Sequence, residues 1–250
     1  MTSNNDTTIV VGASRGLGRG IATAFAASGS PVIAVARNAT ALAELAELAD
    51  NSTSIQPEVA DASDPTVSGT LLDRYDPHAV IVVAGAAPLM RPLQHHTWET
   101  FSANWHTDVR IAFHWVREAL LKPLRPGSRV VVISSGAAVQ GSPLSGGYAG
   151  AKATQRFIAG YARDEAQRAG LDITFTAVLP RITPLTDLGR PAVQAYAARS
   201  GQTEEQYVAR FGAPLTPEIA GASVAELVHA DAAGVAPSYL LTAAGLDKLP

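Results

Sequence analysis

An alternation between short apolar runs and longer alanine-rich stretches is the feature that most constrains the fold of this chain. The runs are rich in β-branched residues and are apolar at consecutive positions, which indicates strands buried on both faces. They cover residues 7–11, 31–35, 79–83, 129–134 and 172–178. Stretches with helical character separate them, so helices are expected to cross between parallel strands and to cover both faces of the sheet. The pattern predicts an α/β fold, a three-layer, doubly wound parallel sheet.

The length of the chain indicates one domain. The chain has 250 residues, 47% of them hydrophobic, which is enough for one sizeable core, and no repeat or low-complexity linker divides it. We therefore expect a single domain over residues 1–250. Residues 180–215 are rich in Pro, Thr and Gly and interrupt the alternation with two expected short helices. Because ligands of open α/β sheets bind beyond the carboxyl ends of the strands, we interpret residues 181–212 as a substrate lid.

Four residues mark the starts of expected helices. They are Asn38, Asp64, Thr97 and Thr216. Each has a side-chain oxygen that accepts from free N–H groups of a first helical turn, and Asp64 and Thr216 are each followed by a proline, which favours the first helical position.

Composition argues against several classes of function. The formal net charge is −3 and no basic run is present, so we expect no nucleic-acid partner. The absence of cysteine excludes disulfides, a thiolate nucleophile and Cys-ligated zinc. His95 and His96 are adjacent with no third ligand at a metal-like spacing, so no metal site is expected. The N-terminal residues are polar and the apolar run 79–90 is too short to span a bilayer, which favours a soluble cytoplasmic protein with no membrane partner.

A glycine-rich turn follows the first expected strand. Gly12, Gly16 and Gly18 form G-x-x-x-G-x-G, which differs in spacing from the commoner G-x-G-x-x-G fingerprint. Such a turn also occurs without a ligand, but here it opens the first helix, where a helix N-terminus receives a pyrophosphate. We therefore expect this turn, with Ser14 and Leu17, to bind a dinucleotide cofactor.

The end of the second expected strand bears on the choice of dinucleotide. An acidic residue there would bind the ribose hydroxyls of NAD, but Ala36 stands in its place and Arg37 follows, then Asn38. Arg15 adds a second guanidinium from the glycine-rich turn. Two guanidiniums suit a dianionic 2′-phosphate, so the sequence favours NADP(H) over NAD(H). The alternative is that both arginines are solvated surface residues.

A tyrosine and a lysine four residues apart form the candidate catalytic pair. Tyr148 and Lys152 are expected on one face of a helix, where they approach each other. A free phenol titrates at about pH 10, and a neighbouring ammonium stabilises the phenolate form. Ser135 ends a buried strand upstream, where its hydroxyl can donate to a substrate carbonyl while Tyr148 transfers a proton. The alternative is a helix-capping serine and an exposed tyrosine.

Taken together, these motifs resemble the short-chain dehydrogenase/reductase family over nearly the whole chain. The glycine turn, the serines 134–135, Tyr148-x-x-x-Lys152 and Pro180 occur in the family's order. The resemblance implies a Rossmann-type fold, hydride transfer linked to NAD(P), Tyr148 as the acid–base residue, and Lys152 holding the nicotinamide ribose as well as tuning Tyr148. It implies that Ser135 orients the substrate.

The resemblance also implies contacts and an assembly. Glu58 and Val59 would lie near the adenine, and Ala84 and Gly85 near a ribose of the cofactor. Further cofactor contacts would come from Pro180 and Thr183. The family often forms homodimers or homotetramers through two long helices, here expected at about 97–121 and 147–170. Trp98, Trp105 and Trp115 lie in the first of these, where we expect core or subunit contacts.

The chain departs from the family pattern at several positions. Val11 replaces a usual Thr, and residues 82–83 replace an Asn pair, which removes hydrogen bonds that support the sheet. Asp108 stands where a catalytic Asn is usual, and we hypothesise that it is a working substitute that favours the charged form of Lys152. Arg181 stands where Gly is common, and it either caps the lid or reaches an anionic substrate group. With Arg181, the segment from Gln140 to Leu144 is expected to contact the substrate.

The sequence thus predicts an NADP(H)-dependent oxidoreductase that interconverts a small ketone or aldehyde and the corresponding alcohol, with reduction favoured. One alternative is a non-catalytic dinucleotide-binding sensor or partner-binding protein that kept the fold, which Asp108 and the missing Asn pair leave open. Another is lyase or isomerase chemistry with the same tyrosine.

Overall fold

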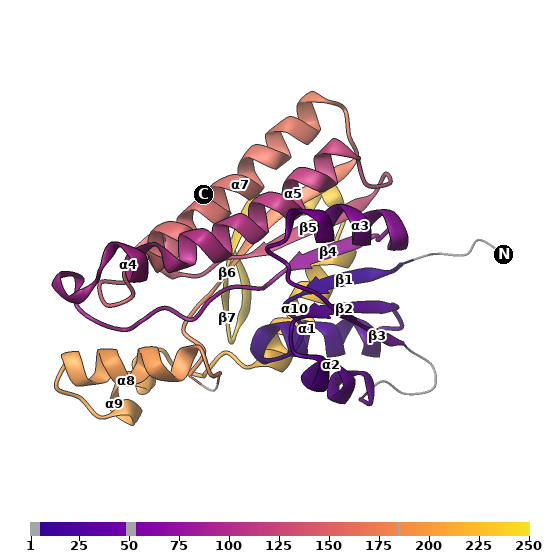
Figure 1. The fold of residues 1–250 in the computed structure, drawn as a ribbon. Coiled ribbons are helices and arrows are strands. Elements are labelled where there is room, and N and C mark those ends of the chain that lie inside the picture. Colours follow the sequence, from indigo (N-terminus) through magenta and orange to yellow (C-terminus); the bar gives the residue numbers. More distant parts are fainter. Residues whose placement is uncertain (1–5, 49–53, 185) are drawn as a thin grey trace.

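The computed structural model describes residues 6–48, 54–184 and 186–250. Its centre is one eight-stranded sheet with the strand order β3-β2-β1-β4-β5-β6-β7-β8 (Figure 1). The strands are β1 (Thr8–Val11), β2 (Val32–Ala36), β3 (Ile55–Val59), β4 (Ala79–Val82), β5 (Ser128–Ile133), β6 (Ile173–Pro180), β7 (Ser238–Thr242) and β8 (Gly245–Leu249). All neighbouring strands pair in parallel except β7 and β8, which form an antiparallel hairpin.

Helices cover both faces of the sheet. On one face lie α1 (Gly16–Ala27), α2 (Ala39–Ala46) and α10 (Pro217–His229), whose apolar side chains share one core cluster. On the other lie α3 (Pro65–Tyr75), α5 (Arg110–Leu121) and α7 (Tyr148–Arg168), which share a second cluster. Within β1, Val10 belongs to the first cluster and Ile9 and Val11 to the second, so successive side chains face opposite layers. The predicted three-layer, doubly wound α/β fold is confirmed.

The five predicted strands are present, with ends shifted by at most a few residues, and three further strands complete the sheet. The strand β3 was not predicted because Pro57 interrupts it and its residues are mostly exposed. Proline lacks an N–H group, and it is tolerated here because β3 is an edge strand that pairs only with β2. The hairpin of β7 and β8 was not predicted either, since β8 is short and largely polar.

All four predicted helix caps are confirmed. The side chains of Asn38 and Asp64 accept from backbone N–H groups two to three residues on, and Thr97 and Thr216 do the same. These caps set the starts of α2, α3, α4 (Trp98–Asn104) and α10, and so they fix where each crossover leaves the sheet.

The long helix predicted at 97–121 is divided into three parts. A π-helical turn, η2 (Trp105–Val109), joins α4 to α5. Trp115 is fully buried in the core, whereas the side chains of Trp98 and Trp105 are exposed. Turns of π-helix are uncommon and often occur at functional sites, and η2 carries Asp108.

The segment after β6 leaves the sheet and forms α8 (Gly189–Arg199) and α9 (Glu204–Ala209), the two short helices expected in residues 180–215. Figure 1 shows these two helices together, beside the α4 end of the molecule. Residue 185, within the predicted lid, lies outside the described residues. In the described part of the chain, no helix combines the length and apolar character needed to cross a bilayer.

Candidate active site

A cleft of about 720 Å³ lies at the carboxyl ends of β1, β2, β4, β5 and β6. The parallel pairing aligns these strand ends, with Val11 beside Val35 and Val82, so the loops that follow them meet in one place. Most of the predicted site residues line this cleft: Gly12, Ser14, Arg15, Gly16, Leu17, Gly18, Arg37, Asn38, Ala84, Gly85, Asp108, Ser135, Gln140, Tyr148, Lys152, Pro180, Arg181 and Thr183.

Two glycines of the turn that lines the cleft, Gly12 and Gly18, have no room for a side chain. Gly12 has a φ of +97°, and a Cβ atom there would lie 2.7 Å from the backbone nitrogen of Ala84. A Cβ atom on Gly18 would lie 2.0 Å from the carbonyl oxygen of Gly12. Arg15, at the N-cap of α1, makes no side-chain capping bond. The first-turn N–H groups of α1 therefore have no side-chain cap, and the turn fits the pyrophosphate of a dinucleotide.

Two arginines line the cleft near this turn, as predicted. Arg15 is exposed and lies 3.8 Å from Asp187 of the segment before α8. Arg37 is also exposed, and its positive charge contributes to lowering the pKa of Asp61. The pKa of Asp61 is held below its ordinary value, first by hydrogen bonds from the backbone N–H and hydroxyl groups of Ser63 and then by the charge of Arg37. The cleft thus has exposed guanidiniums where a 2′-phosphate was predicted.

Three predicted residues do not line the cleft. Glu58 accepts hydrogen bonds from Tyr75 and Arg74 on α3, and the side chain of Val59 is exposed. The residues that line the cleft instead are Ala60, Asp61, Ala62 and Ser63, just beyond the end of β3. Leu144 is buried, with its backbone bonded to Arg91 and Tyr196. Glu58 and Val59 were assigned from the family resemblance alone; both lie within β3, whereas the residues that line the cleft follow its last residue.

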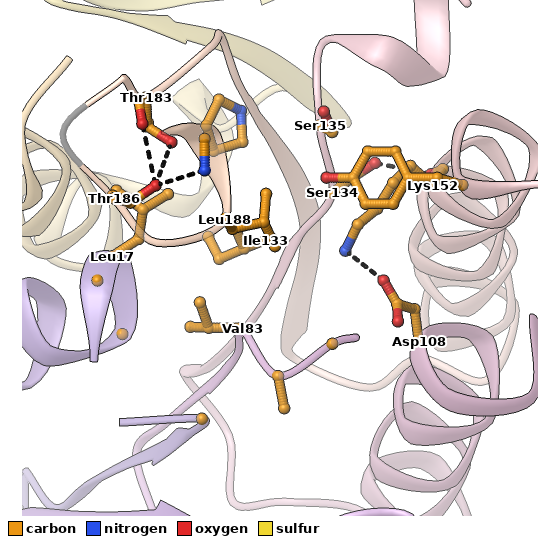
Figure 2. Close-up of a pocket in the computed structure, with 18 of the residues that line it drawn as sticks. Leu17, Val83, Asp108, Ile133, Ser134, Ser135, Lys152, Thr183, Thr186 and Leu188 are labelled. Atoms are coloured by element: carbon orange, nitrogen blue, oxygen red, sulfur yellow. Dashed lines mark hydrogen bonds and ion pairs between the residues drawn. The ribbon is translucent and has the colours of Figure 1, made fainter. Parts of the chain in front are cut away.

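Tyr148 and Lys152 lie together at the start of α7. Their side chains are almost fully buried, and the Lys152 Nζ atom lies 5.5 Å from the centroid of the Tyr148 ring. Ser135, in the loop after β5, lines the same cleft, and its Oγ atom accepts from the backbone N–H of Ala137 at 3.2 Å. The adjacent Ser134 donates to the backbone oxygen of Lys152 at 2.7 Å, which ties β5 to α7. The geometry therefore places a hydroxyl, a phenol and an ammonium in one cleft (Figure 2).

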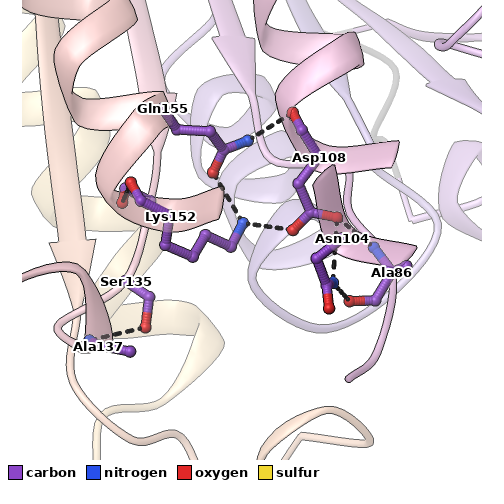
Figure 3. A network of polar contacts seen from close by, with 8 residues as sticks. Ala86, Asn104, Asp108, Ser135, Ala137, Lys152 and Gln155 are labelled. Atoms are coloured by element: carbon purple, nitrogen blue, oxygen red, sulfur yellow. Dashed lines mark hydrogen bonds and ion pairs between the residues drawn. The ribbon is translucent and has the colours of Figure 1, made fainter. Parts of the chain in front are cut away.

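Asp108 lies against the lysine. Its Oδ2 atom is 3.0 Å from Nζ of Lys152, and both side chains are buried (Figures 2 and 3). Its Oδ1 atom accepts from the backbone N–H of Ala86 at 2.8 Å and from Nδ2 of Asn104 at 3.3 Å. A Cβ atom on Gly85 would lie 2.7 Å from Oδ2, so this glycine leaves the space that the carboxylate occupies. The carboxylate is therefore close to Lys152, which is the condition on which its hypothesised effect on the lysine depends.

The surroundings of Lys152 raise its pKa above the ordinary value. Burial has the largest single effect and by itself lowers the pKa, because it disfavours the charged amine. The charge of Asp108, the proximity of Tyr148 and the hydrogen bond to Asp108 together outweigh burial. Lys152 is therefore held as an ammonium beside the phenol.

Sequence reasoning missed two features of the site. Gln155, one turn after Lys152 on α7, is fully buried and contacts both Lys152 and Asp108. The signal that could have found it is a polar residue on the buried face of a helix, three positions from the lysine. The second is an aromatic cluster of Tyr196 on α8, Tyr207 on α9 and Phe211 just after α9.

The aromatic cluster closes the other end of the cleft. The rings of Tyr196 and Tyr207 stack with centroids 6.1 Å apart, and Phe211 meets Tyr207 edge-on at 5.3 Å. The Tyr196 hydroxyl is 2.7 Å from Oγ of Ser142, in the loop that also carries Gln140. These contacts tie α8 to the loop before α7 and give this end of the cleft an apolar wall.

No group of three or more His, Asp or Glu side chains in the described ranges is arranged to hold a metal ion. His96 is partly buried, and its ring lies within hydrogen-bonding distance of Thr100 and of the backbone oxygen of Arg91. These contacts assign it a structural part in the loop before α4.

Comparisons with known proteins identify relatives among the short-chain dehydrogenases and reductases. The family model for short chain dehydrogenase matches residues 6–197. A hydroxynaphthalene reductase-like protein, Arp2, of Metarhizium robertsii is 31% identical over 69% of the chain and 66% of its own length. A 3-oxoacyl-[acyl-carrier-protein] reductase of Synechocystis is 30% identical over 79% of the chain and 84% of its length. A versicolorin reductase, stcU, of Emericella nidulans is 28% identical over 84% of the chain and 80% of its own length.

Solved structures share the fold. The structure of NAD+-bound xylitol dehydrogenase superposes with a TM-score of 0.82 over 95% of this chain and 97% of its own, at 17% identity. A short chain dehydrogenase from Mycobacterium avium superposes with a TM-score of 0.76 over 100% of this chain and 86% of its own, at 19% identity. The family match covers most of the chain, and the glycine turn and the Tyr148–Lys152 pair lie within it. The chain belongs to the short-chain dehydrogenase/reductase family of oxidoreductases.

Proposed function

We propose that the protein is an NADP(H)-dependent oxidoreductase that interconverts a ketone or aldehyde and the corresponding alcohol, with Tyr148 as the acid–base residue. The observation that carries the proposal is the placement of Tyr148 and Lys152 at the cleft, with the ammonium 5.5 Å from the phenol ring. When bound, the nicotinamide supplies or accepts the hydride. The protein's own contribution is to hold the substrate and to move a proton at the Tyr148 hydroxyl.

In this proposal Ser135 and Lys152 serve the same proton transfer. The Ser135 hydroxyl donates to the substrate oxygen and orients it towards Tyr148. The ammonium of Lys152 stabilises negative charge that develops on the phenol oxygen, and it binds a ribose of the cofactor. Asp108 holds this ammonium at 3.0 Å, and in that sense it substitutes for the usual Asn.

The proposed preference for NADP(H) rests on Arg15 and Arg37. Both are exposed and line the cleft beside the glycine turn, and Ala36 leaves no acidic group to compete for the ribose. Gly12, Gly16 and Gly18 bind the pyrophosphate in this proposal, and Ala84, Gly85, Pro180 and Thr183 contact the ribose and nicotinamide.

The substrate is proposed to lie between the catalytic pair and the aromatic wall of the lid. Gln140 and Arg181 line this part of the cleft, and Tyr196, Tyr207 and Phe211 give it an apolar side. The reductase names of the three relatives support the reductive direction. Exposed aromatic side chains at Trp98, Trp105, Phe157 and Tyr161 support a homo-oligomer through α4, η2 and α7.

The experiment that tests the proposal is incubation of the protein with NADPH or NADH and a panel of ketones and aldehydes. Oxidation of NADPH that depends on a panel member supports the reductase. The rival from another class is a dinucleotide-binding sensor, and NADPH that binds but is never consumed supports it. Product formation without a change in the cofactor's redox state would indicate lyase or isomerase chemistry instead.

A further inference from the structure

Gln155 closes a ring of polar contacts around the candidate catalytic lysine. Its Oε1 atom accepts a hydrogen bond from Nζ of Lys152 at 2.9 Å, and its Nε2 atom donates to the backbone oxygen of Asp108 at 2.9 Å. The ring is completed by the ion pair between Lys152 and Asp108 (Figure 3). The side chains of Gln155 and Asp108 have no exposed surface, and Lys152 is almost fully buried.

The chemistry of the ring fixes the orientation of the Gln155 amide. An ammonium only donates and a carbonyl oxygen only accepts, so the reversed amide would place NH₂ against Lys152 and oxygen against the Asp108 carbonyl. An ammonium has three N–H donors. Lys152 donates one hydrogen bond to Gln155 and forms an ion pair with Asp108 at 3.0 Å.

The contacts of the Asp108 side chain suit a carboxylate, which only accepts. Its two oxygens face only donor groups: the ammonium of Lys152, the backbone N–H of Ala86 and the amide N–H of Asn104. A side-chain amide at position 108 would turn its own NH₂ towards one of these donors. The ring therefore holds one positive charge, one negative charge and one neutral amide, and its net charge is zero.

Few other charges act on Tyr148 and Lys152. The elements packed against the start of α7 present the neutral groups Ser134, Ser135 and Asn104, and Asp108 on η2. One further titratable group, the ring of His96, lies beside Gly146 in the loop that leads into α7. The remaining charged side chains that line the cleft are all exposed, so solvent screens them. They are Arg15, Arg37, Asp61, Arg181 and Asp187.

We propose that Gln155 and Asp108 form a charge-neutral unit with Lys152. Because the unit has no net charge, Tyr148 and Lys152 keep their protons up to a higher pH than they would if Lys152 had no counter-charge. Gln155 is then a positioning residue, and its uncharged amide is the property that matters. A phenol beside a net positive charge loses its proton early and acts as a base, whereas a phenol beside a neutral pair keeps its proton. The phenol is thereby kept in the protonated form, which is the form that carbonyl reduction needs at the start of the reaction.

The test measures the first proton lost by the Tyr148–Lys152 pair in the folded protein. The chain has six tyrosines and three lysines, so ¹³C labels on the Tyr ζ and Lys ε carbons give few NMR signals. The variants Tyr148→Phe and Lys152→Met identify the two signals of interest by their loss. Titration of both signals then gives the pH midpoint of the first proton loss without cofactor or substrate.

Three variants set the charge of the ring, and a fourth is the control. Gln155→Glu adds a negative charge and is expected to raise the midpoint by about one pH unit. Asp108→Asn removes a negative charge and is expected to lower the midpoint by about the same amount. The double variant Asp108→Asn/Gln155→Glu moves the carboxylate across the ring and is expected to return the midpoint close to that of the wild type. Gln155→Met is uncharged and of similar length, so it should move the midpoint far less than Gln155→Glu.

The proposal is overturned if Gln155→Glu and Gln155→Met give the same midpoint, or if Asp108→Asn does not lower it. Should Asp108→Asn fail to fold, as judged by circular dichroism, the two Gln155 variants decide, since they leave the Asp108 side chain in place. The catalytic consequence rests on the proposed function, whereas the titration does not. Midpoints that move as expected in a protein without turnover would contradict the reductase and leave the charge-neutral ring standing.

Discussion

The ammonium of Lys152 and the carboxylate of Asp108 form an ion pair of 3.0 Å in which both side chains are buried. Each partner supplies the counter-charge of the other, and Asn104, Ala86 and Gln155 add hydrogen bonds around the pair. Removal of one partner of a buried ion pair strongly destabilises the folded protein, because the other charge is left buried without a partner. The pair is therefore both a structural element and part of the proton-handling site.

Asp108→Asn is expected to reduce the free energy of unfolding by about 2 kcal/mol, because the new amide must turn a donor towards a donor and leaves the ammonium without a counter-charge. Urea denaturation of the purified variant measures this. The matched control is Asp187→Asn, which alters an exposed carboxylate 3.8 Å from Arg15 and should leave the unfolding midpoint unchanged. Equal stabilities of the two variants would show that the buried pair contributes nothing.

The raised pKa of Lys152 predicts a dependence of stability on alkaline pH. Its ordinary value is 10.5 and its folded value is higher, so the folded state binds this proton more tightly than the unfolded state does. The stabilisation is fully present below about pH 10.5 and is lost as the pH rises through the folded pKa. The difference in unfolding free energy between wild type and Lys152→Met should therefore be constant at neutral pH and shrink only above that value. A difference that shrinks on acidification from neutral pH would contradict the sign.

The close approach at the glycine turn makes Gly18 intolerant of any side chain. Gly18→Ala would place its Cβ atom 2.0 Å from the carbonyl oxygen of Gly12, so α1 must move away from the turn. We expect loss of dinucleotide binding, measured by calorimetry, and a lower melting temperature. Gly160→Ala in α7 is the control, because nothing lies within 4 Å of that Cβ position, and it should raise helix stability by about 0.5–1 kcal/mol.

The proposed role of the two arginines predicts a specific change in cofactor preference. Arg15→Ala and Arg37→Ala should each weaken NADPH binding by about tenfold or more, since each removes charge-assisted hydrogen bonds to the 2′-phosphate. The affinity for NADH should stay the same, because it lacks that phosphate. Arg19→Ala is the matched control, as Arg19 lies on α1 but pairs with Glu44 and does not line the cleft. Parallel losses for both dinucleotides would count against a 2′-phosphate site.

Much of the fold was predictable because local signals and tertiary structure agree. Consecutive β-branched residues mark the central strands, and Asn38, Asp64, Thr97 and Thr216 cap helices where their side chains predicted it. The strand β3 was missed because its signal is weak: it lies at the sheet edge, where packing on β2 and not its own composition selects the extended backbone.

The site was predictable where a motif fixes the spacing and not where contacts come from distant segments. Tyr148 and Lys152 are four residues apart on one helix, so their proximity follows from helix geometry. The contact of Gln155 with Asp108 joins α7 to η2, across 47 residues of sequence, and no local pattern encodes it. The contact between Tyr196 on α8 and Ser142 spans 54 residues in the same way.

The account depends on proton transfer by Tyr148, and the most direct measurement is the turnover number of Tyr148→Phe with NADPH and a carbonyl compound that the wild type reduces. Tyr161→Phe is the control, because Tyr161 lies on the same helix with its side chain exposed. We predict that Tyr148→Phe binds NADPH as the wild type does and loses about 10²–10⁴-fold in turnover number, while Tyr161→Phe keeps wild-type turnover. Turnover by Tyr148→Phe at the wild-type rate would contradict the account.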